Sequence, residues 1–114
     1  MWHCGSFDVD TSKTQIMGIV NVTPDSFSDG GNFASTSTAV EHAHELIAQG
    51  ATIIDIGGES TRPGSEAPSI QEEIDRVVPV ISALADCGVP LSVDTRHAAV
   101  ARAAVEAGAH IIND

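Results

Sequence analysis

Four short apolar runs in this chain each end at an acidic or carboxamide residue. The runs span 16–20, 53–54, 91–93 and 111–112, and the residues that follow them are Asn21, Asp55, Asp94 and Asn113. Apolar runs this short, separated by segments of helix length, are typical of buried parallel strands. Because α/β folds place their chemistry at the carboxyl ends of such strands, the pattern predicts a site built from four strand ends.

Two six-residue phrases of the chain are near copies of each other. Residues 50–55 read Gly-Ala-Thr-Ile-Ile-Asp, and residues 108–113 read Gly-Ala-His-Ile-Ile-Asn. A glycine after a helical stretch supplies the left-handed backbone that ends a helix. Residues 88–94 are a looser third copy. The repeats therefore predict a run of strand–loop–helix units, which form a parallel α/β sheet or barrel.

The expected elements follow from the apolar periodicity and the cap signals. Strands are expected over about 15–20, 52–56 and 91–93, with a fourth that ends at Asn113. Helices are expected from about 35–37 to Gly50, from Ser69 onward, and over about 97–107 with Thr95 as its cap. Residues 1–14 are expected to form a lead-in hairpin over the floor of the sheet.

The second helix carries the clearest local signals. Ser69 and Glu72 have the spacing of a capping box. Pro79 lies inside the helical pattern and predicts a kink, because proline removes a backbone donor. The buried stripe of this helix is expected to consist of Ile74, Val77, Val78, Ile81 and Leu84.

The unit count favours part of a barrel. About four βα units are half of the eight that close a (β/α)₈ barrel, so the fold expected for residues 1–114 is the first half of a TIM barrel, with strands 1–4 and helices 1–3 in 15–114. A complete flavodoxin-like domain is the alternative. Against it, the segments 21–34 and 57–68 are longer than most loops in compact α/β units. Long loops at strand ends are typical of substrate handling, and the chain is interpreted as a truncated one.

Charge and composition exclude several function classes. The formal net charge of −11 disfavours nucleic acid and anionic membranes as partners, because both need basic surfaces. No stretch approaches the ~20 apolar residues of a membrane span, and no signal peptide is visible. Cys4 and Cys87 lie far apart, without metal-like spacing, which favours reduced thiols in a cytoplasmic protein.

The first two loops hold groups suited to a metal ion and an anion. The carboxamide of Asn21, at a strand end, is a suitable ligand for Mg²⁺, although from this residue alone a hydrogen bond to the loop backbone is the favoured interpretation. In the segment 57–64, two glycines allow close approach to a ligand, Thr61 offers a hydroxyl, and Arg62 offers a planar fork for phosphate or carboxylate. A cation at this place would offset the acidic chain if the ligand is anionic.

The later strand ends hold carboxylates that are expected to be buried. Asp55 and Asp94 would each need hydrogen-bond donors, and for Asp55 a structural bond to loop N–H groups is an equal possibility. Asp94 and Asn113 together would suit a heterocycle with an amidine-like edge. Four histidines lack ligand spacing and are interpreted as structural or surface residues: His42, His44, His97 and His110.

These motifs together resemble one enzyme family. Residues 16–31 (IMGIVNVTPDSFSDGG) and 57–64 (GGESTRPG) are similar to the first two signatures of dihydropteroate synthase, the pterin-binding enzyme of folate synthesis. Residues 92–95 and 111–114 match its next two strand ends. The resemblance implies a (β/α)₈ barrel that condenses 6-hydroxymethyl-7,8-dihydropterin diphosphate with 4-aminobenzoate. The products are 7,8-dihydropteroate and pyrophosphate, and Mg²⁺ assists.

The resemblance also implies roles for individual residues. Asn21 would bind the Mg²⁺ that neutralises the departing pyrophosphate. Thr61 and Arg62 would contact the diphosphate, and Asp94 and Asn113 would hold the pterin. Of these, the resemblance makes Asn21, Thr61, Arg62 and Asp94 the catalytic group.

The remaining implied residues belong to the first two loops. Phe27 and Pro63 would shape the aminobenzoate pocket, and Asp29 would lie in the first loop. The family's groups on strands 5, 7 and 8 have no counterpart here, so this chain alone is expected to be inactive, and a homodimer is expected at full length. A pterin-dependent methyltransferase domain and a non-catalytic half-barrel are the alternatives.

Overall fold

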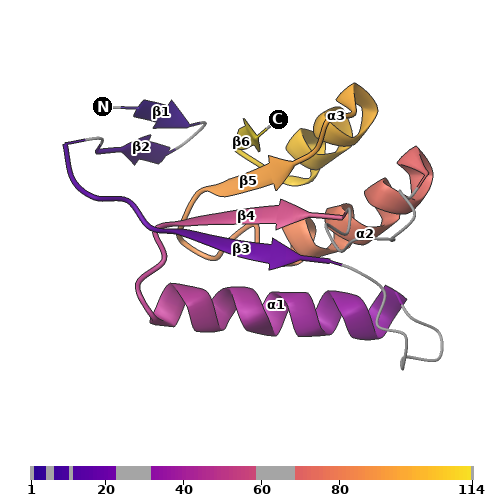
Figure 1. The fold of residues 1–114 in the computed structure, drawn as a ribbon, viewed down its shortest axis with the longest axis horizontal. Coiled ribbons are helices and arrows are strands. Elements are labelled where there is room, and N and C mark those ends of the chain that lie inside the picture. Colours follow the sequence, from indigo (N-terminus) through magenta and orange to yellow (C-terminus); the bar gives the residue numbers. More distant parts are fainter. Residues whose placement is uncertain (1, 5–6, 11, 23–31, 59–68, 114) are drawn as a thin grey trace, which may run out of the picture.

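The protein is built around a four-stranded parallel sheet with helices on one face (Figure 1). The computed structural model describes residues 2–4, 7–10, 12–22, 32–58 and 69–113. The sheet order is β3-β4-β5-β6, with bounds Met17–Asn21, Ile53–Gly57, Leu91–Asp94 and Ile111–Asn113. Each strand follows the last through a helix, and these are α1 Asn32–Ala48, α2 Ile70–Ala83 and α3 Ala98–Ala107.

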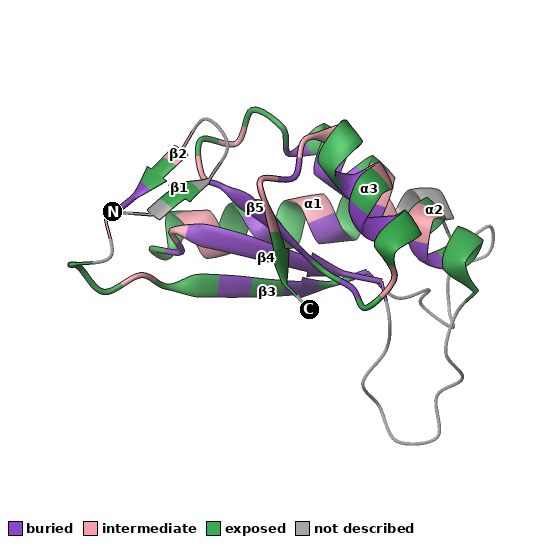
Figure 2. Cartoon of the chain, turned by 90° about the horizontal axis from the view of Figure 1, so that it is seen from above, coloured by how far each residue is buried: buried purple, intermediate pink, exposed green. Residues whose placement is uncertain are grey.

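The core lies between the sheet and the helices (Figure 2). Alternate strand residues point to this side because successive side chains of a strand face opposite ways. The strand contribution is Val20, Ile54, Ile56, Leu91 and Val93, and the helices add Ala43, Val77, Ile81, Val100 and Ala104. Burying each valine, leucine or isoleucine of this set stabilises the fold by about 1.5–3 kcal/mol.

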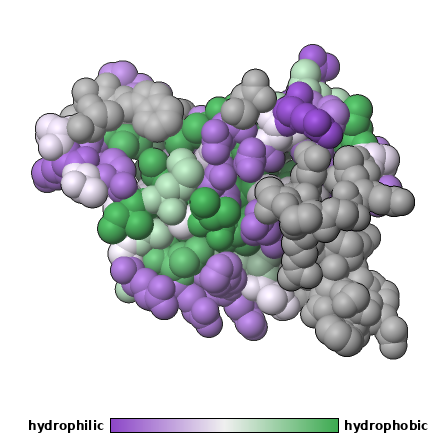
Figure 3. Space-filling model, in the orientation of Figure 1, coloured by the Kyte–Doolittle hydropathy of each residue, from purple (hydrophilic) through white to green (hydrophobic). Residues whose placement is uncertain are grey.

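The other face of β3 is apolar and uncovered in this chain. Met17 is 41% exposed and Ile19 is 59% exposed, whereas the alternate residues Gly18 and Val20 are buried. Figure 3 shows apolar side chains gathered in the middle of the face seen in Figure 1. An apolar residue facing away from the helices is expected of a barrel strand, both faces of which are covered.

The helix-end signals agree with the structure at most ends. The Glu72 N–H donates to Ser69 Oγ at 3.1 Å, and the Glu72 side chain accepts from the Ser69 N–H, which confirms the capping box. Gly50 and Gly108 have φ of +112° and +128°, the region that glycine enters most easily.

The first helix begins at Asn32, earlier than the predicted 35–37. Serine and threonine are common both at caps and in first turns, so the run 35–38 did not locate the start.

The buried stripe of α2 differs in part from its prediction. Val77, Ile81 and Leu84 are buried as expected. Val80 is also buried, while Ile74 and Val78 are only half-buried. The stripe is therefore rotated slightly, because α2 packs against both α1 and α3 as well as β4. Pro79 lies within the continuous helix Ile70–Ala83, and its expected kink stays a prediction.

A β-hairpin precedes the sheet, where a lead-in hairpin was expected. Strands β1 (Trp2–Cys4) and β2 (Phe7–Val9) pair antiparallel. The ring of Phe7 meets the edge of His110, which directly precedes β6, so the hairpin lies at the amino ends of the sheet strands (Figure 1). The Ser12 hydroxyl and N–H both donate to Asp10 and hold the pKa of that carboxyl below its usual value.

Gly18 allows α1 to approach β3 closely. A Cβ at this position would lie 3.0 Å from Leu46 Cδ1 and 3.1 Å from Ile54 Cδ1. Gly18→Ala is therefore expected to lower the free energy of unfolding by about 1–3 kcal/mol, the usual cost of overpacking. Chemical denaturation measures it, with the exposed Ser82→Ala as control. If the denaturation midpoint of Gly18→Ala is unchanged, the core accommodates the added methyl group without loss of stability.

Candidate functional site

Three polar side chains lie in one layer at the carboxyl edge of the sheet. In the strand register, Asn21 pairs with Gly57, Gly57 with Asp94, and Asp94 with Asn113. These positions share the face that points away from the helices, because the preceding residues of β3, β4 and β5 enter the core and Asn113 is paired in register with Asp94. The predicted clustering of Asn21, Asp94 and Asn113 is thus found, and Gly57 leaves the layer without a side chain between Asn21 and Asp94.

A second polar layer lies one step below. Asp55 is paired with Ile19 on one side and Ser92 on the other, and it is 3% exposed. Asn113 Nδ2 donates to Asp55 Oδ2 at 3.3 Å, so a side-chain bond joins the two layers. The bond from Asp55 to loop N–H groups considered above stays a prediction, because most of the loop residues lie outside the described ones. Among the described residues, Asp55 Oδ1 and Ser92 Oγ of this layer are buried without a hydrogen-bond partner, as is Glu73 Oε1 on α2.

The predicted burial is right for Asp55 and wrong for Asp94. Asp94 is exposed. It is the last residue of β5 and lies beyond the core layer that Val93 fills, on the face that no helix covers. A carboxylate in this place keeps its contact with solvent, so it is accessible to a ligand at the sheet edge.

Gly58 has a packing reason that the sequence did not reveal. A Cβ there would lie 3.1 Å from Val77 Cγ1 and 3.2 Å from Glu73 Cγ, so α2 packs directly on the backbone after β4. Arg76 Nη1 donates to the Gly58 carbonyl at 2.8 Å. The start of the second loop is therefore held by α2.

Five predicted site residues lie outside the described residues: Phe27, Asp29, Thr61, Arg62 and Pro63. Their roles stay predictions.

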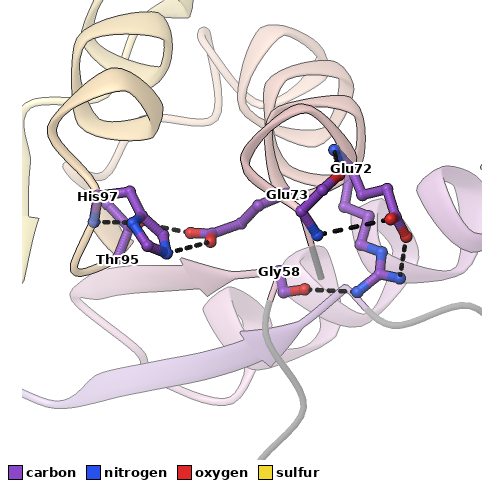
Figure 4. A network of polar contacts seen from close by, with 7 residues as sticks. Gly58, Glu72, Glu73, Thr95 and His97 are labelled. Carbon is purple, nitrogen blue, oxygen red and sulfur yellow. Dashed lines mark hydrogen bonds and ion pairs between the residues drawn. The ribbon is translucent and has the colours of Figure 1, made fainter. Parts of the chain in front are cut away.

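Sequence reasoning missed a buried polar network beside the strand ends (Figure 4). Glu73 of α2 is 1% exposed, and its Oε2 accepts a hydrogen bond from Thr95 Oγ1. His97 Nε2 lies 3.9 Å from Glu73 Oε1. The missed signal was a carboxylate one helical turn before Val77 on the apolar face of α2. Thr95 was expected to cap α3, but the N-cap is His97, whose N–H donates to Thr95 Oγ1 at 3.1 Å.

The interpretation of the histidines agrees with the structure. His42 and His44 are exposed on α1. His110 Nδ1 accepts the N–H of Leu91 at 3.1 Å, which is a structural bond between neighbouring strands. In the described part of the chain, no three His, Cys, Asp or Glu residues form a group that could hold a metal ion. A metal at the strand ends would therefore need ligands such as carboxamides, water or substrate oxygens.

Comparison with known proteins assigns the family. The sequence profile described as pterin binding enzyme matches residues 17–114, which is most of the chain. This chain belongs to the pterin-binding enzyme family. The match begins at the first residue of β3 and includes all four strand ends of the candidate site.

Relatives of the pterin-binding enzyme chain are dihydropteroate synthases. The enzyme of Bacillus subtilis is 62% identical over 103 residues, which are 90% of this chain and 36% of the relative. The Xanthomonas albilineans dihydropteroate synthase solved with 4-aminobenzoic acid has a TM-score of 0.88 at 52% identity, over 97% of this chain and 42% of that one. The Burkholderia cenocepacia enzyme complexed with 7,8-dihydropteroate has a TM-score of 0.82 at 44% identity, over 97% and 36%.

The chain thus spans about two fifths of the length of these relatives. The expected fold class, a run of βα units from a TIM barrel, is confirmed by the parallel sheet and by these structural matches. Among the described residues, none of the helices of this pterin-binding family member is long and apolar enough to cross a membrane.

The bond between Asn113 and Asp55 predicts a measurable coupling of the two layers. Asn113→Ala removes the donor to a buried carboxylate whose other oxygen has no partner among the described residues. Leaving a buried acceptor unsatisfied costs about 1–3 kcal/mol, so the free energy of unfolding should fall by that amount. Chemical denaturation measures the change, and Glu106→Ala, at an exposed position of α3, is the control. Equal stability of the two variants would show that the Asn113 bond contributes nothing.

Proposed function

We propose that the protein containing this chain is a dihydropteroate synthase of folate biosynthesis. It would condense 6-hydroxymethyl-7,8-dihydropterin diphosphate with 4-aminobenzoate to 7,8-dihydropteroate and pyrophosphate. The observation that carries the proposal is the layer of Asn21, Asp94 and Asn113 at adjacent strand ends, in a chain 62% identical to a dihydropteroate synthase. Solved structures of two such enzymes, one with 4-aminobenzoic acid and one with 7,8-dihydropteroate, support the proposed substrate and product.

The exposed strand-end groups suit a pterin ring. The Asp94 carboxylate can accept from ring N–H and amino groups, and the Asn113 carboxamide can both donate and accept. Their strands are paired in register, so both side chains could bind one ligand at the carboxyl edge of the sheet. A charged acceptor at the amidine-like edge of the pterin gives stronger hydrogen bonds than a neutral one.

The diphosphate end of the substrate would be held by the first two loops. Thr61 and Arg62 would bind its oxygens, and Phe27, Pro63 and Asp29 would form the aminobenzoate side. In the reaction, the bond from the pterin methylene carbon to the diphosphate oxygen breaks. A bond from that carbon to the aminobenzoate nitrogen forms, and the nitrogen loses a proton. The electron-rich dihydropterin held by Asp94 and Asn113 would stabilise positive charge on the carbon.

A magnesium ion fits the groups at this edge. Asn21 ends β3 with an exposed carboxamide, and Mg²⁺ binds proteins through few oxygen ligands while keeping water and phosphate oxygens. When bound, Mg²⁺ would neutralise charge on the departing pyrophosphate. Asn21 would orient that end of the substrate, which a chain of net charge −11 would otherwise repel.

The proposed protein would be a homodimer in the cytoplasm. The homodimer follows from the family resemblance, and the cytoplasm from the two widely spaced cysteines, which favour reduced thiols. The Cys87 thiol is free, as expected for a reducing compartment.

A pyrophosphate-release assay on the protein expressed from its complete reading frame tests the proposed function. Release should require both the dihydropterin diphosphate and 4-aminobenzoate. Asp94→Ala should lower kcat/KM for the pterin substrate at least about tenfold, because hydrogen bonds to a charged group contribute about 1.5–3 kcal/mol. Glu106→Ala serves as control. Absence of aminobenzoate-dependent release from the wild-type protein would refute the proposal.

Asn21→Ala separates a metal role from a pterin role. It should weaken the Mg²⁺ dependence of turnover and the affinity for the diphosphate substrate. The affinity for a pterin without the diphosphate should stay unchanged, because Asn21 would not touch the ring. Isothermal titration with both ligands measures the difference. A comparable loss of affinity for the two ligands would make Asn21 a pterin ligand and contradict the assignment.

A further inference from the structure

A buried carboxylate on α2 lies behind the strand ends. Glu73 is 1% exposed, although it lies on the apolar face of the helix with Val77 and Ile81. Burying a carboxylate is costly unless hydrogen bonds compensate it. Part of the compensation is the first turn of α2, whose N-terminal dipole favours negative charge. Thr95 Oγ1 donates to Glu73 Oε2 at 2.5 Å (Figure 4). Among the described residues Glu73 Oε1 has no hydrogen-bond partner, and His97 Nε2 lies 3.9 Å from it.

Thr95 joins the two strand ends that carry the pterin-facing residues. It directly follows Asp94, and its N–H donates to the carbonyl of Asn113 at 3.1 Å. Its hydroxyl accepts from the N–H of His97 at 3.1 Å, where α3 begins. The Thr95 hydroxyl therefore accepts one hydrogen bond from the His97 N–H and donates another to Glu73. Because Thr95 is 6% exposed, water does not compete freely for these bonds.

The same turn of α2 also holds the loop after β4. A Cβ on Gly58 would lie 3.2 Å from both Glu73 Cγ and the Glu73 carbonyl oxygen. Arg76 Nη1 donates to the Gly58 carbonyl at 2.8 Å, and Arg76 Nη2 lies 3.6 Å from Glu72 Oε2. Glu73 thus lies beside the Gly58 backbone, which leads into the second loop, and bonds the side chain of Thr95, which follows β5.

We infer that Glu73 is a positioning residue, which acts through the Thr95 hydroxyl to hold Asp94 and Asn113 in their shared layer. A well-packed apolar residue in place of a buried ionised group is often neutral or stabilising, so stability alone does not account for Glu73. A role as the fixed acceptor of the Thr95 hydroxyl accounts for Glu73, because misplacing a binding group by about 1 Å can cost about 100-fold in rate. The catalytic consequence rests on the proposed function, whereas the structural part stands apart from it.

The test compares Glu73→Ala, Thr95→Val and Thr95→Ser in the protein from the complete reading frame. Glu41→Ala, at an exposed position of α1, is the matched control. Kinetics are measured well below the melting temperature of every variant. Glu73→Ala and Thr95→Val should each lower kcat/KM for the pterin substrate by about 10- to 100-fold, while KM for 4-aminobenzoate changes little. Thr95→Ser, which keeps the hydroxyl, should be close to wild type.

Coupling between the two residues is a second readout. If Glu73 acts through Thr95, the double variant should lose no more activity than either single variant. Additive losses, or equal losses for both substrates that follow the fall in melting temperature, would overturn the inference and leave a role in stability only. Should Glu73→Ala fail to fold, Glu73→Leu, which fills the space without an acceptor, and Thr95→Val decide the question.

Amide exchange keeps the inference separate from the proposed function. The Thr95 N–H, bonded to Asn113, should exchange about tenfold faster in Glu73→Ala than in Glu41→Ala, a change of about 1.4 kcal/mol in local opening. Equal exchange would refute the positioning role. Absence of turnover in the wild type would refute the proposed function, and the exchange experiment would still decide the role of Glu73.

Discussion

The parallel register of β3 to β6 is the constraint on which the rest of the structure depends. Backbone hydrogen bonds align Asn21, Gly57, Asp94 and Asn113 across four strands, and a shift of one residue would turn each side chain to the opposite face. The helices cover the face opposite these residues, so the register decides both which residues form the core and which ones reach the edge. The same strand alignment therefore places the core on one face of the sheet and the candidate site on the other.

The polar groups around this edge differ in how strongly they are held. Asn21 and Asp94 are exposed at the strand ends, which suits groups that meet a ligand. Asp55 and Glu73 are buried carboxylates, and each is bonded to a partner on another element. Buried bonds of this kind resist displacement because their partners cannot easily turn to water. The structure therefore combines an accessible layer with a supporting layer behind it.

Helix α2 is the element that links the segment after β4 to the segment after β5. Its capping box sets where the helix begins, and hence where Glu73 and Arg76 lie relative to the sheet. Arg76 then bonds the Gly58 carbonyl, and Glu73 bonds Thr95. The capping box at Ser69 thus helps to set the contacts that α2 makes with the segments after β4 and β5. The relatives reported above share 44–62% identity with this chain over the matched residues.

The sequence by itself determined the order of strands and helices, the four strand ends and the family. Apolar runs, glycine stops and the Ser69 capping box are local signals, so they can be interpreted without knowing what packs against them. Tertiary structure decided the rest. The exposure of Asp94, the bond from Asn113 to Asp55, the packing reason for Gly58 and the burial of Glu73 all depend on contacts between residues 15 to 58 positions apart in the chain. Burial and hydrogen-bond partners follow from the alignment of whole elements, which the strand register and the packing of α2 against α1, α3 and β4 set together.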